Sequence, residues 1–357
     1  MWRLVFAGSL FVLFIAPAAA GQIGGRVAEY QHGDDATDPL DEASAAYQRG
    51  DCATAIRLFR SLAEDPGMAL AQASLSAMYA NGEGVPQDFT QAFYWTRKAA
   101  DQGNPDAQVN LGMAYFKGDG VERDFAEAAK WLREAADQGS PVAQRELGLL
   151  YEKGQGVPQD YVQAASWYSK AADQGNADAQ TSLGWMYAEG RGVSQDLAQA
   201  LAWFRKGADQ GNAVAQYNLG AMYAKANGVP QDFGQAFKWF GKAADQGNAV
   251  AQAALGALYA EGNGVPQDFA QAFDWFGKAA AKGNTYAQVS LGALYAEGYG
   301  VPQDYTQALM WTTLAITRAE DDATRELAAN RRDALAVKMT PSQIAEAQRM
   351  AREWSPK

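Results

Sequence analysis

The chain has 357 residues, of which 48% are hydrophobic and 20% are charged, a composition typical of a globular protein. Its formal net charge of −11 argues against a nucleic acid partner, because phosphates require a basic surface, and the lack of a polybasic run argues against docking on anionic lipid. A single cysteine, Cys52, excludes an intramolecular disulfide, so packing alone must hold the fold. We expect Cys52 to be a small, half-buried side chain near a helix start.

Residues 1–20 have the three parts of an export signal. A positive start, "MWR", precedes the apolar run "LVFAGSLFVLFIA" and the small-residue stretch "PAAAG", which predicts cleavage after Ala20. The apolar run is short for a transmembrane helix, although an uncleaved anchor is the alternative. We therefore predict an exported protein, periplasmic or secreted, with no stable membrane insertion after cleavage.

Residues 21–42 are polar, rich in glycine and aspartate, and without helical periodicity, which predicts a flexible leader. The only histidine, His32, falls in this leader, and we expect it to be neither a ligand nor a base. Residues 43–68 read as a degenerate helix pair with a shortened loop. This pair is expected to cap the N-terminal end of the array that follows.

Residues 69–315 repeat with a period of 36 residues and no insertions, in seven units. Two aromatic residues mark each unit at this spacing: Trp95, Trp131, Trp167, Trp203, Trp239, Trp275 and Trp311, and Tyr79, Tyr115, Tyr151, Tyr187, Tyr223, Tyr259 and Tyr295. So strict a period predicts stacked supersecondary units rather than independent domains.

Each unit contains two helical patterns. In the second unit, Leu111, Gly112 and Tyr115 recur at helical spacing in the first pattern, and Trp131 belongs to the apolar stripe of the second. A glycine follows each pattern, as a helix end requires, and Asn104 precedes the first pattern as an N-cap. We therefore interpret the residues of these stripes as core residues rather than as catalytic or ligand-binding residues.

The motif "GVPQD", or a close variant, opens the second helix of every unit. Its Asp is followed three residues later by Gln or Glu, in the pairs Asp88/Gln91, Asp124/Glu127, Asp160/Gln163, Asp196/Gln199, Asp232/Gln235, Asp268/Gln271 and Asp304/Gln307. This spacing predicts a capping box, in which the Asp accepts from first-turn N–H groups and the Gln or Glu bonds back to the cap N–H. Only one carboxylate, the motif's Asp, is present in every copy of the loop, which is too few for calcium, and no Lys or Ser/Thr completes a phosphate loop. The motif is therefore interpreted as a helix start.

The assembled unit, "A-x-x-x-L-G-x-x-Y-x-x-G-x-G-V-x-x-D-x-x-x-A-x-x-W-x-x-x-A-A-x-x-G", resembles the Sel1-like repeat family, relatives of tetratricopeptide repeats. The resemblance implies an all-α fold, a right-handed α-solenoid (superhelix) of stacked antiparallel helix pairs. Two departures are Ser76, in place of the glycine after leucine, and Ala226, in place of a loop glycine, where we expect Asn227 to take the left-handed conformation. Residues 316–357 predict two polar-faced cap helices, the second opening with a capping box of Thr340 and Gln343.

No catalytic constellation is apparent, because the chain has no histidine outside the leader and only one cysteine. We predict no enzyme activity, no cofactor and no metal. We therefore predict a scaffold or adaptor that binds a partner protein or peptide on its concave face, and we expect a monomer. The resemblance implies a role in assembling or regulating a complex of the cell envelope, in signalling or in host interaction. One alternative is a cell-wall or glycan-binding module, with Trp185 and Tyr217 as stacking platforms. Another is a weak hydrolase of cell-wall or β-lactam substrates, although the similar proteins with that activity carry paired cysteines.

By analogy with tetratricopeptide arrays, the concave face should be lined by first-helix positions two before the core leucine and two and five after it. In the middle units these positions vary, whereas in the first unit all three are alanine. The candidate partner-binding residues are Val109, Met113, Phe116, Arg145, Leu149, Glu152, Thr181, Trp185 and Tyr217. The open alternative is that Phe116 and Trp185 only pack between helices.

Overall fold

The computed structural model describes residues 38–319 and 321–355, which contain 18 α-helices and no strand. The predicted signal peptide and the leader up to residue 37 lie outside the described residues. The first helix, α1, begins at Pro39, so the expected end of the leader at residue 42 is too late. The Asp38 side chain accepts a hydrogen bond from the Leu40 N–H (2.9 Å), and Pro39 takes the first helical position, where a missing N–H costs nothing.

The helices follow the repeat. α1 (Pro39–Gln48) and α2 (Cys52–Ala63) form the first pair, with Cys52 half-buried at the start of α2, as predicted. The seven repeats supply α3 (Ala69–Asn81), α4 (Phe89–Asp101), α5 (Pro105–Lys117), α6 (Phe125–Asp137), α7 (Pro141–Lys153), α8 (Tyr161–Asp173), α9 (Ala177–Glu189), α10 (Leu197–Asp209), α11 (Ala213–Lys225), α12 (Phe233–Asp245), α13 (Ala249–Glu261), α14 (Phe269–Ala281), α15 (Thr285–Glu297) and α16 (Tyr305–Arg318). The chain ends with α17 (Asp322–Ala336) and α18 (Pro341–Glu353).

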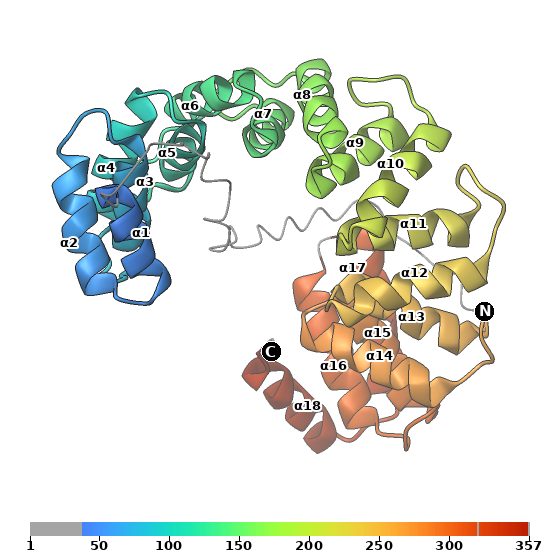
Figure 1. Cartoon of the computed structure of the whole chain (residues 1–357). Coiled ribbons are helices and arrows are strands. Elements are labelled where there is room, and N and C mark those ends of the chain that lie inside the picture. Colours follow the sequence, from blue (N-terminus) through green and yellow to red (C-terminus); the bar gives the residue numbers. More distant parts are fainter. Residues whose placement is uncertain (1–37, 320, 356–357) are drawn as a thin grey trace. The chain divides into compact units, whose positions relative to one another are not determined.

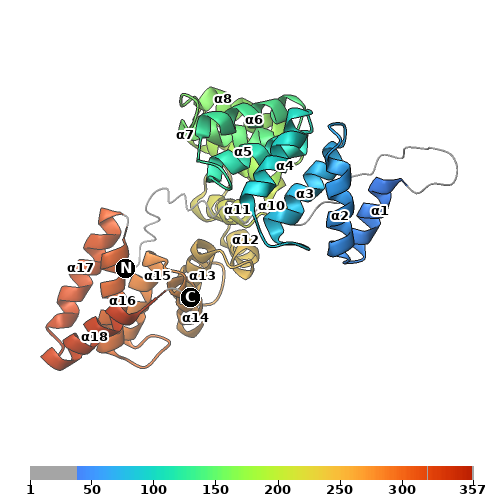
Figure 2. The same ribbon diagram turned by 90° about the vertical axis from the view of Figure 1, so that its left-hand side faces the viewer.

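The described residues form two compact units. The N-terminal unit holds residues 38–179 and 190–194, and the C-terminal unit holds residues 180–189, 195–319 and 321–355. Within each unit, consecutive helices pack on one another, for example α4 on α3 and α5, or α13 on α12 and α14 (Figure 1). At the C-terminal end, α17 and α18 both pack on α16 (Figure 2). Each unit is therefore an α-solenoid of stacked helix pairs with a 36-residue period, as the sequence predicts.

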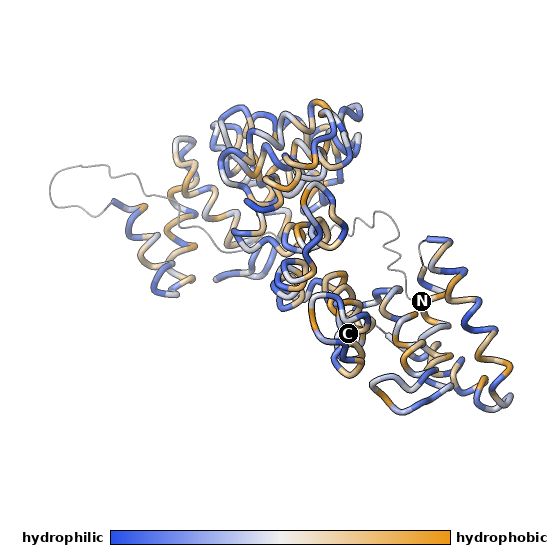
Figure 3. Tube along the Cα trace, turned by 90° about the vertical axis from the view of Figure 1, so that its right-hand side faces the viewer, coloured by the Kyte–Doolittle hydropathy of each residue, from blue (hydrophilic) through white to orange (hydrophobic). Residues whose placement is uncertain are grey.

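The core depends on small residues in the first helix of each repeat. Hydrophobic and hydrophilic residues both occur along the helices (Figure 3), and the buried hydrophobic residues are mostly alanine, leucine and aromatic side chains. A Cβ added at Gly148 would lie 2.8 Å from the Tyr168 ring, so glycine lets the second helix approach. The first repeat solves the same problem differently, because Ser76 faces the small Thr96 and their hydroxyls hydrogen-bond.

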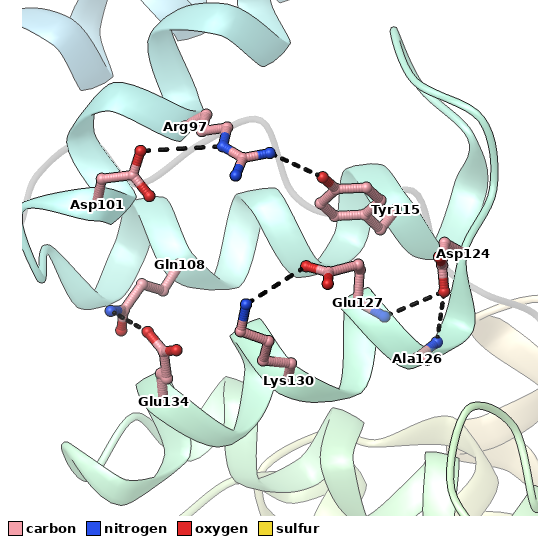
Figure 4. A network of polar contacts seen from close by, with 9 residues as sticks. All are labelled: Arg97, Asp101, Gln108, Tyr115, Asp124, Ala126, Glu127, Lys130 and Glu134. Atoms are coloured by element: carbon pink, nitrogen blue, oxygen red, sulfur yellow. Dashed lines mark hydrogen bonds and ion pairs between the residues drawn. The ribbon is translucent and has the colours of Figure 1, made fainter.

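The aspartate of the "GVPQD" motif caps the second helix, as predicted. Asp124 accepts hydrogen bonds from the backbone N–H groups of Ala126 (2.8 Å) and Glu127 (3.1 Å), shown in Figure 4. The predicted return bond is wrong, because the Asp124 N–H donates instead to the carbonyl of Tyr115 (2.9 Å). The loop thus ties the start of one helix to the end of the previous one, and a complete capping box occurs at Thr340 and Gln343.

The carbonyls at the end of the first helix of a repeat have no partner within the helix. They accept hydrogen bonds from the glutamine of the motif and from the N–H groups of the turn that directly follows this helix. Gln159 donates from Nε2 to the carbonyl of Glu152 (2.8 Å) near the end of α7. After α11 the left-handed residue is Ala226 itself (φ 58°), so the expectation that Asn227 takes this conformation is wrong. The left-handed turn lets the N–H groups of Ala226 and Asn227 both donate to the carbonyl of Met222. The first residue after the helix therefore takes the left-handed conformation because of its position, even when it is an alanine.

Candidate functional site

The nine candidate residues fall on first helices in both units. Six belong to α5 and α7 of the N-terminal unit, and the other three belong to α9 and α11 of the C-terminal unit. We call the first set the α5–α7 surface: Val109, Met113, Phe116, Arg145, Leu149 and Glu152.

The apolar part of the α5–α7 surface lies partly in the core. Val109 and Phe116 are half-buried and pack against a cluster that includes Leu132 and Leu147. The Phe116 ring meets Phe125 edge-on, with ring centroids 5.3 Å apart. Met113 is half-buried, and Leu149 is only 8% exposed. Phe116 therefore packs between helices and also keeps part of its side chain in solvent.

The polar part of the α5–α7 surface is a charged group on α7. The guanidinium of Arg145 pairs with the carboxylate of Glu146, and Glu152 accepts a hydrogen bond from the Tyr168 hydroxyl (2.7 Å). Burial opposes the charge of Arg145, but Glu146 and, more weakly, Asp178 hold its pKa above the usual value. The side chains of Arg145 and Glu146 are only 23% and 15% exposed, so this pair is largely withdrawn from water.

The candidate residues of the C-terminal unit are more enclosed. Thr181 is buried, and the half-buried Trp185 meets Phe204 edge-on at 5.7 Å between ring centroids. The Tyr217 ring packs on Phe240 at 5.6 Å, and burial raises the pKa of Tyr217 to about 12. Much of each aromatic ring therefore contacts the core of its own repeat.

Three residues of the charged group were not among the predicted site residues: Glu146, Tyr168 and Asp178. Glu146 directly precedes the core Leu147, a position that the tetratricopeptide analogy does not assign to the groove. Its side chain is only 15% exposed, so Glu146 lies at the edge of the buried stripe, and a charged residue at such a position is the sequence signal that could have found it. Asp178 and Tyr168 come from the two following helices, and no local sequence signal links them to Arg145.

Most other polar contacts serve the repeat itself. In Figure 4, Arg97 donates to the Tyr115 hydroxyl of the next repeat (3.2 Å), and Gln108 donates to Glu134 (3.1 Å). Equivalent bonds join Arg60 to Tyr79 and Arg133 to Tyr151. The Arg–Tyr bonds recur between successive repeats, so they stabilise the stacking of repeats rather than mark a site, whereas the Gln108–Glu134 bond joins the two helices of one repeat.

Two further properties concern only residues 38–319 and 321–355. No three His, Cys, Asp or Glu side chains among them are grouped as metal binding requires. None of the helices in this part of the chain has the length and apolar character needed to cross a membrane.

The family follows from the match of the repeat units. The model of the Sel1 repeat matches seven consecutive segments: residues 69–104, 105–140, 141–176, 177–212, 213–248, 249–284 and 285–319. The chain belongs to the Sel1 repeat family. Sel1 repeats generally mediate protein–protein interactions and typically form non-catalytic scaffolds.

The solved structures that are similar to this Sel1 repeat protein include two with more than 30% sequence identity to it. A Sel1 repeat protein from Oxalobacter formigenes is 34% identical over 86% of this chain and 97% of its own, with a TM-score of 0.63. The protein c5321, described as a protective antigen of uropathogenic Escherichia coli with an SLR fold, is 31% identical over 88% of this chain and 90% of its own, with a TM-score of 0.54. A search of the curated proteins finds no match.

Proposed function

We propose that this Sel1 repeat protein is an exported, non-catalytic scaffold that binds a partner protein or peptide through the α5–α7 surface. The partner belongs to a signalling or assembly complex of the cell envelope. Export is proposed from the charged, apolar and small-residue parts of residues 1–20. The family's general role in protein–protein interaction supports the scaffold function.

One observation carries this proposal. The three variable positions of the first helix are Ala73, Ala77 and Ala80 in α3, and that helix packs in the same way as α5 and α7. The fold therefore does not require large side chains there. At the same positions α5 carries valine, methionine and phenylalanine, and α7 carries arginine, leucine and glutamate. Of these residue types, Met, Phe and Arg are enriched at protein interfaces.

The test is site-specific photo-crosslinking in the native cell. A benzophenone amino acid replaces Met113 on the α5–α7 surface, or Ser166, an exposed residue on the second helix of the following repeat, as a control. We expect one dominant protein adduct from position 113 and none of the same mass from position 166. Equal adducts from both positions, or no protein adduct from position 113, would refute the proposed surface.

Export is tested separately by mass spectrometry of the protein isolated from its cell. Cleavage after Ala20 gives a chain that starts at Gly21 and is recovered outside the cytoplasm. A chain that keeps residues 1–20 in the cytoplasmic fraction would contradict the proposed location but leave the binding surface untouched.

A further inference from the structure

A recurring pair of glutamines ties the two helices of a repeat together. The glutamine that directly follows the second helix donates from Nε2 to Oε1 of a glutamine in the first helix, 30 residues earlier. The first five repeats contain this pair: Gln102 to Gln72 (2.6 Å), Gln138 to Gln108 (2.7 Å), Gln174 to Gln144 (2.8 Å), Gln210 to Gln180 (2.7 Å) and Gln246 to Gln216 (2.8 Å). The first-helix glutamines are at most 5% exposed, so each pair satisfies an acceptor that is withdrawn from water.

The pairing stops in the sixth and seventh repeats, at Gln252 and Gln288. The residues 30 positions further on are Lys282 and Arg318. Lys282 donates from Nζ to the carbonyl of Gly247 (2.6 Å), and neither glutamine Oε1 has a hydrogen-bond partner among residues 38–319 and 321–355. Gln288 is 0% exposed, so its Oε1 is a fully buried acceptor without a partner in this part of the chain, which is unfavourable.

Arg318 contacts α18 instead. Its guanidinium lies over the ring of Trp354, 4.3 Å from the centroid, and Trp354 also meets Trp311 of α16 edge-on at 6.0 Å. A cation over an indole face is attracted by the ring electrons, so Arg318 stabilises the docking of α18 on α16. Arg318 also has the position of the pairing glutamines, and its Nε stands as many bonds from Cα as the Nε2 of a glutamine. Its side chain therefore has the length needed to donate to Gln288.

The docking of α18 depends mainly on α16. In a repeat such as the first, the two helices α3 and α4 pack on each other, whereas α17 and α18 both pack on α16 and little on one another. A cavity of about 300 Å³ lies between α16, α17 and α18, and its lining includes Ile316, Ala336 and Ile344. Few contacts besides those with α16 therefore oppose a movement of α18.

We propose that α18 is a latch with two positions, set by the partner of Arg318. In the closed position, which the structure shows, Arg318 stacks on Trp354 and Oε1 of Gln288 has no hydrogen bond from it. In the open position Arg318 donates to Gln288, as the glutamines do in the first five repeats, and α18 leaves α16. The new buried hydrogen bond offsets part of the lost stacking, which brings the two positions closer in free energy. Opening uncovers the apolar side chains of Leu309 and Leu314 on α16.

Hydrogen–deuterium exchange of the full chain, measured by mass spectrometry, reports how often α18 opens. Gln288→Glu replaces the amide by a carboxylate, which attracts Arg318 more strongly, so we expect the amides of α18 to exchange about tenfold faster. The matched control is Gln252→Glu, the same change one repeat earlier, which should leave the exchange of α18 unchanged. Circular dichroism verifies that the variants are folded.

Variants of Arg318 separate this competition from a general loss of stability. Arg318→Gln removes the stacking on Trp354 and restores the glutamine pair, so its thermal midpoint should exceed that of Arg318→Ala while α18 exchanges faster than in the unmodified protein. Adding Gln288→Glu to Arg318→Gln should not change the exchange of α18 further, because no arginine is left to attract.

Three results would refute the latch. The first is an unchanged exchange of α18 in Gln288→Glu. The second is an equal acceleration by Gln252→Glu or by Gln288→Glu in the Arg318→Gln background. The third is equal thermal midpoints for Arg318→Gln and Arg318→Ala, and this comparison decides alone if the carboxylate at position 288 prevents folding.

Discussion

The two glycines of each loop should respond very differently to the same substitution. In the third repeat, Gly154 and Gly156 both have positive φ angles, +67° and +70°. A Cβ at Gly154 would meet its nearest atom, in the Gln159 side chain, at 3.1 Å. A Cβ at Gly156 would lie 1.9 Å from the carbonyl oxygen of Phe125, at the start of α6 in the preceding repeat. Gly156→Ala therefore disturbs the stacking of two repeats, whereas Gly154→Ala strains only its own turn.

The magnitudes follow from these distances. A left-handed alanine costs about 1–2 kcal/mol, partly offset by the lower entropy of the unfolded chain, so Gly154→Ala should cost about 1 kcal/mol. The chain itself contains an alanine at the equivalent position, Ala226. Gly156→Ala adds the cost of displacing backbone, about 1–3 kcal/mol, and should total about 2–4 kcal/mol.

Urea unfolding followed by circular dichroism at 222 nm measures both variants. Because Gly156 lies at an interface between repeats, we also expect its variant to unfold over a broader range of urea, as repeats uncouple. If the two variants lose equal stability, or if Gly154→Ala loses more, the assignment of the second glycine to repeat stacking is wrong.

Three further changes test the account of the loops and helices. Asp160→Ala should lower the free energy of unfolding by about 0.5–2 kcal/mol through loss of the cap, and urea unfolding that shows no change would contradict the capping role. Ala226→Gly should raise the thermal midpoint, since it relieves about 1 kcal/mol of left-handed strain; a lower midpoint would show that the turn is not strained. Gly241→Arg should stabilise the chain by about 1 kcal/mol in urea unfolding, because a Cβ there meets no atom within 4 Å and glycine is a poor residue inside a helix. A destabilised Gly241→Arg variant would show that this open space is needed.

Much of the fold could be predicted because its determinants are local. The glycine ends and the Asp caps each depend on residues within a few positions of one another, and the 36-residue period repeats these local signals in every unit. The predicted return bond from Glu127 to the Asp124 N–H failed because that N–H lies within reach of Tyr115, nine residues earlier. The loop between the two helices brings this N–H and the Tyr115 carbonyl together, and neither the Asp124 nor the Tyr115 side chain indicates this backbone bond. For the same reason, Ala226 adopts a conformation that residue preference would assign to Asn227.

The candidate site could be predicted only in part. Arg145 and Glu152 were found because they differ from the repeat pattern, and the structure adds the partners that modify them, Glu146 and Tyr168. Tyr168 lies on a different helix, so its bond to Glu152 depends on how α8 packs on α7. The role of the nine predicted residues in partner binding stays a prediction.

The most direct test of the central claim is the affinity of the crosslinked partner for two matched double variants. Calorimetry would compare Met113→Ala/Glu152→Ala, on the α5–α7 surface, with Lys130→Ala/Glu127→Ala, on α6. The first variant should bind the partner at least about tenfold more weakly, and the affinity of the second should change by no more than about twofold. Unchanged binding by the first variant, with its helicity intact, or an equal loss in the second, would contradict the claim that this surface binds the partner.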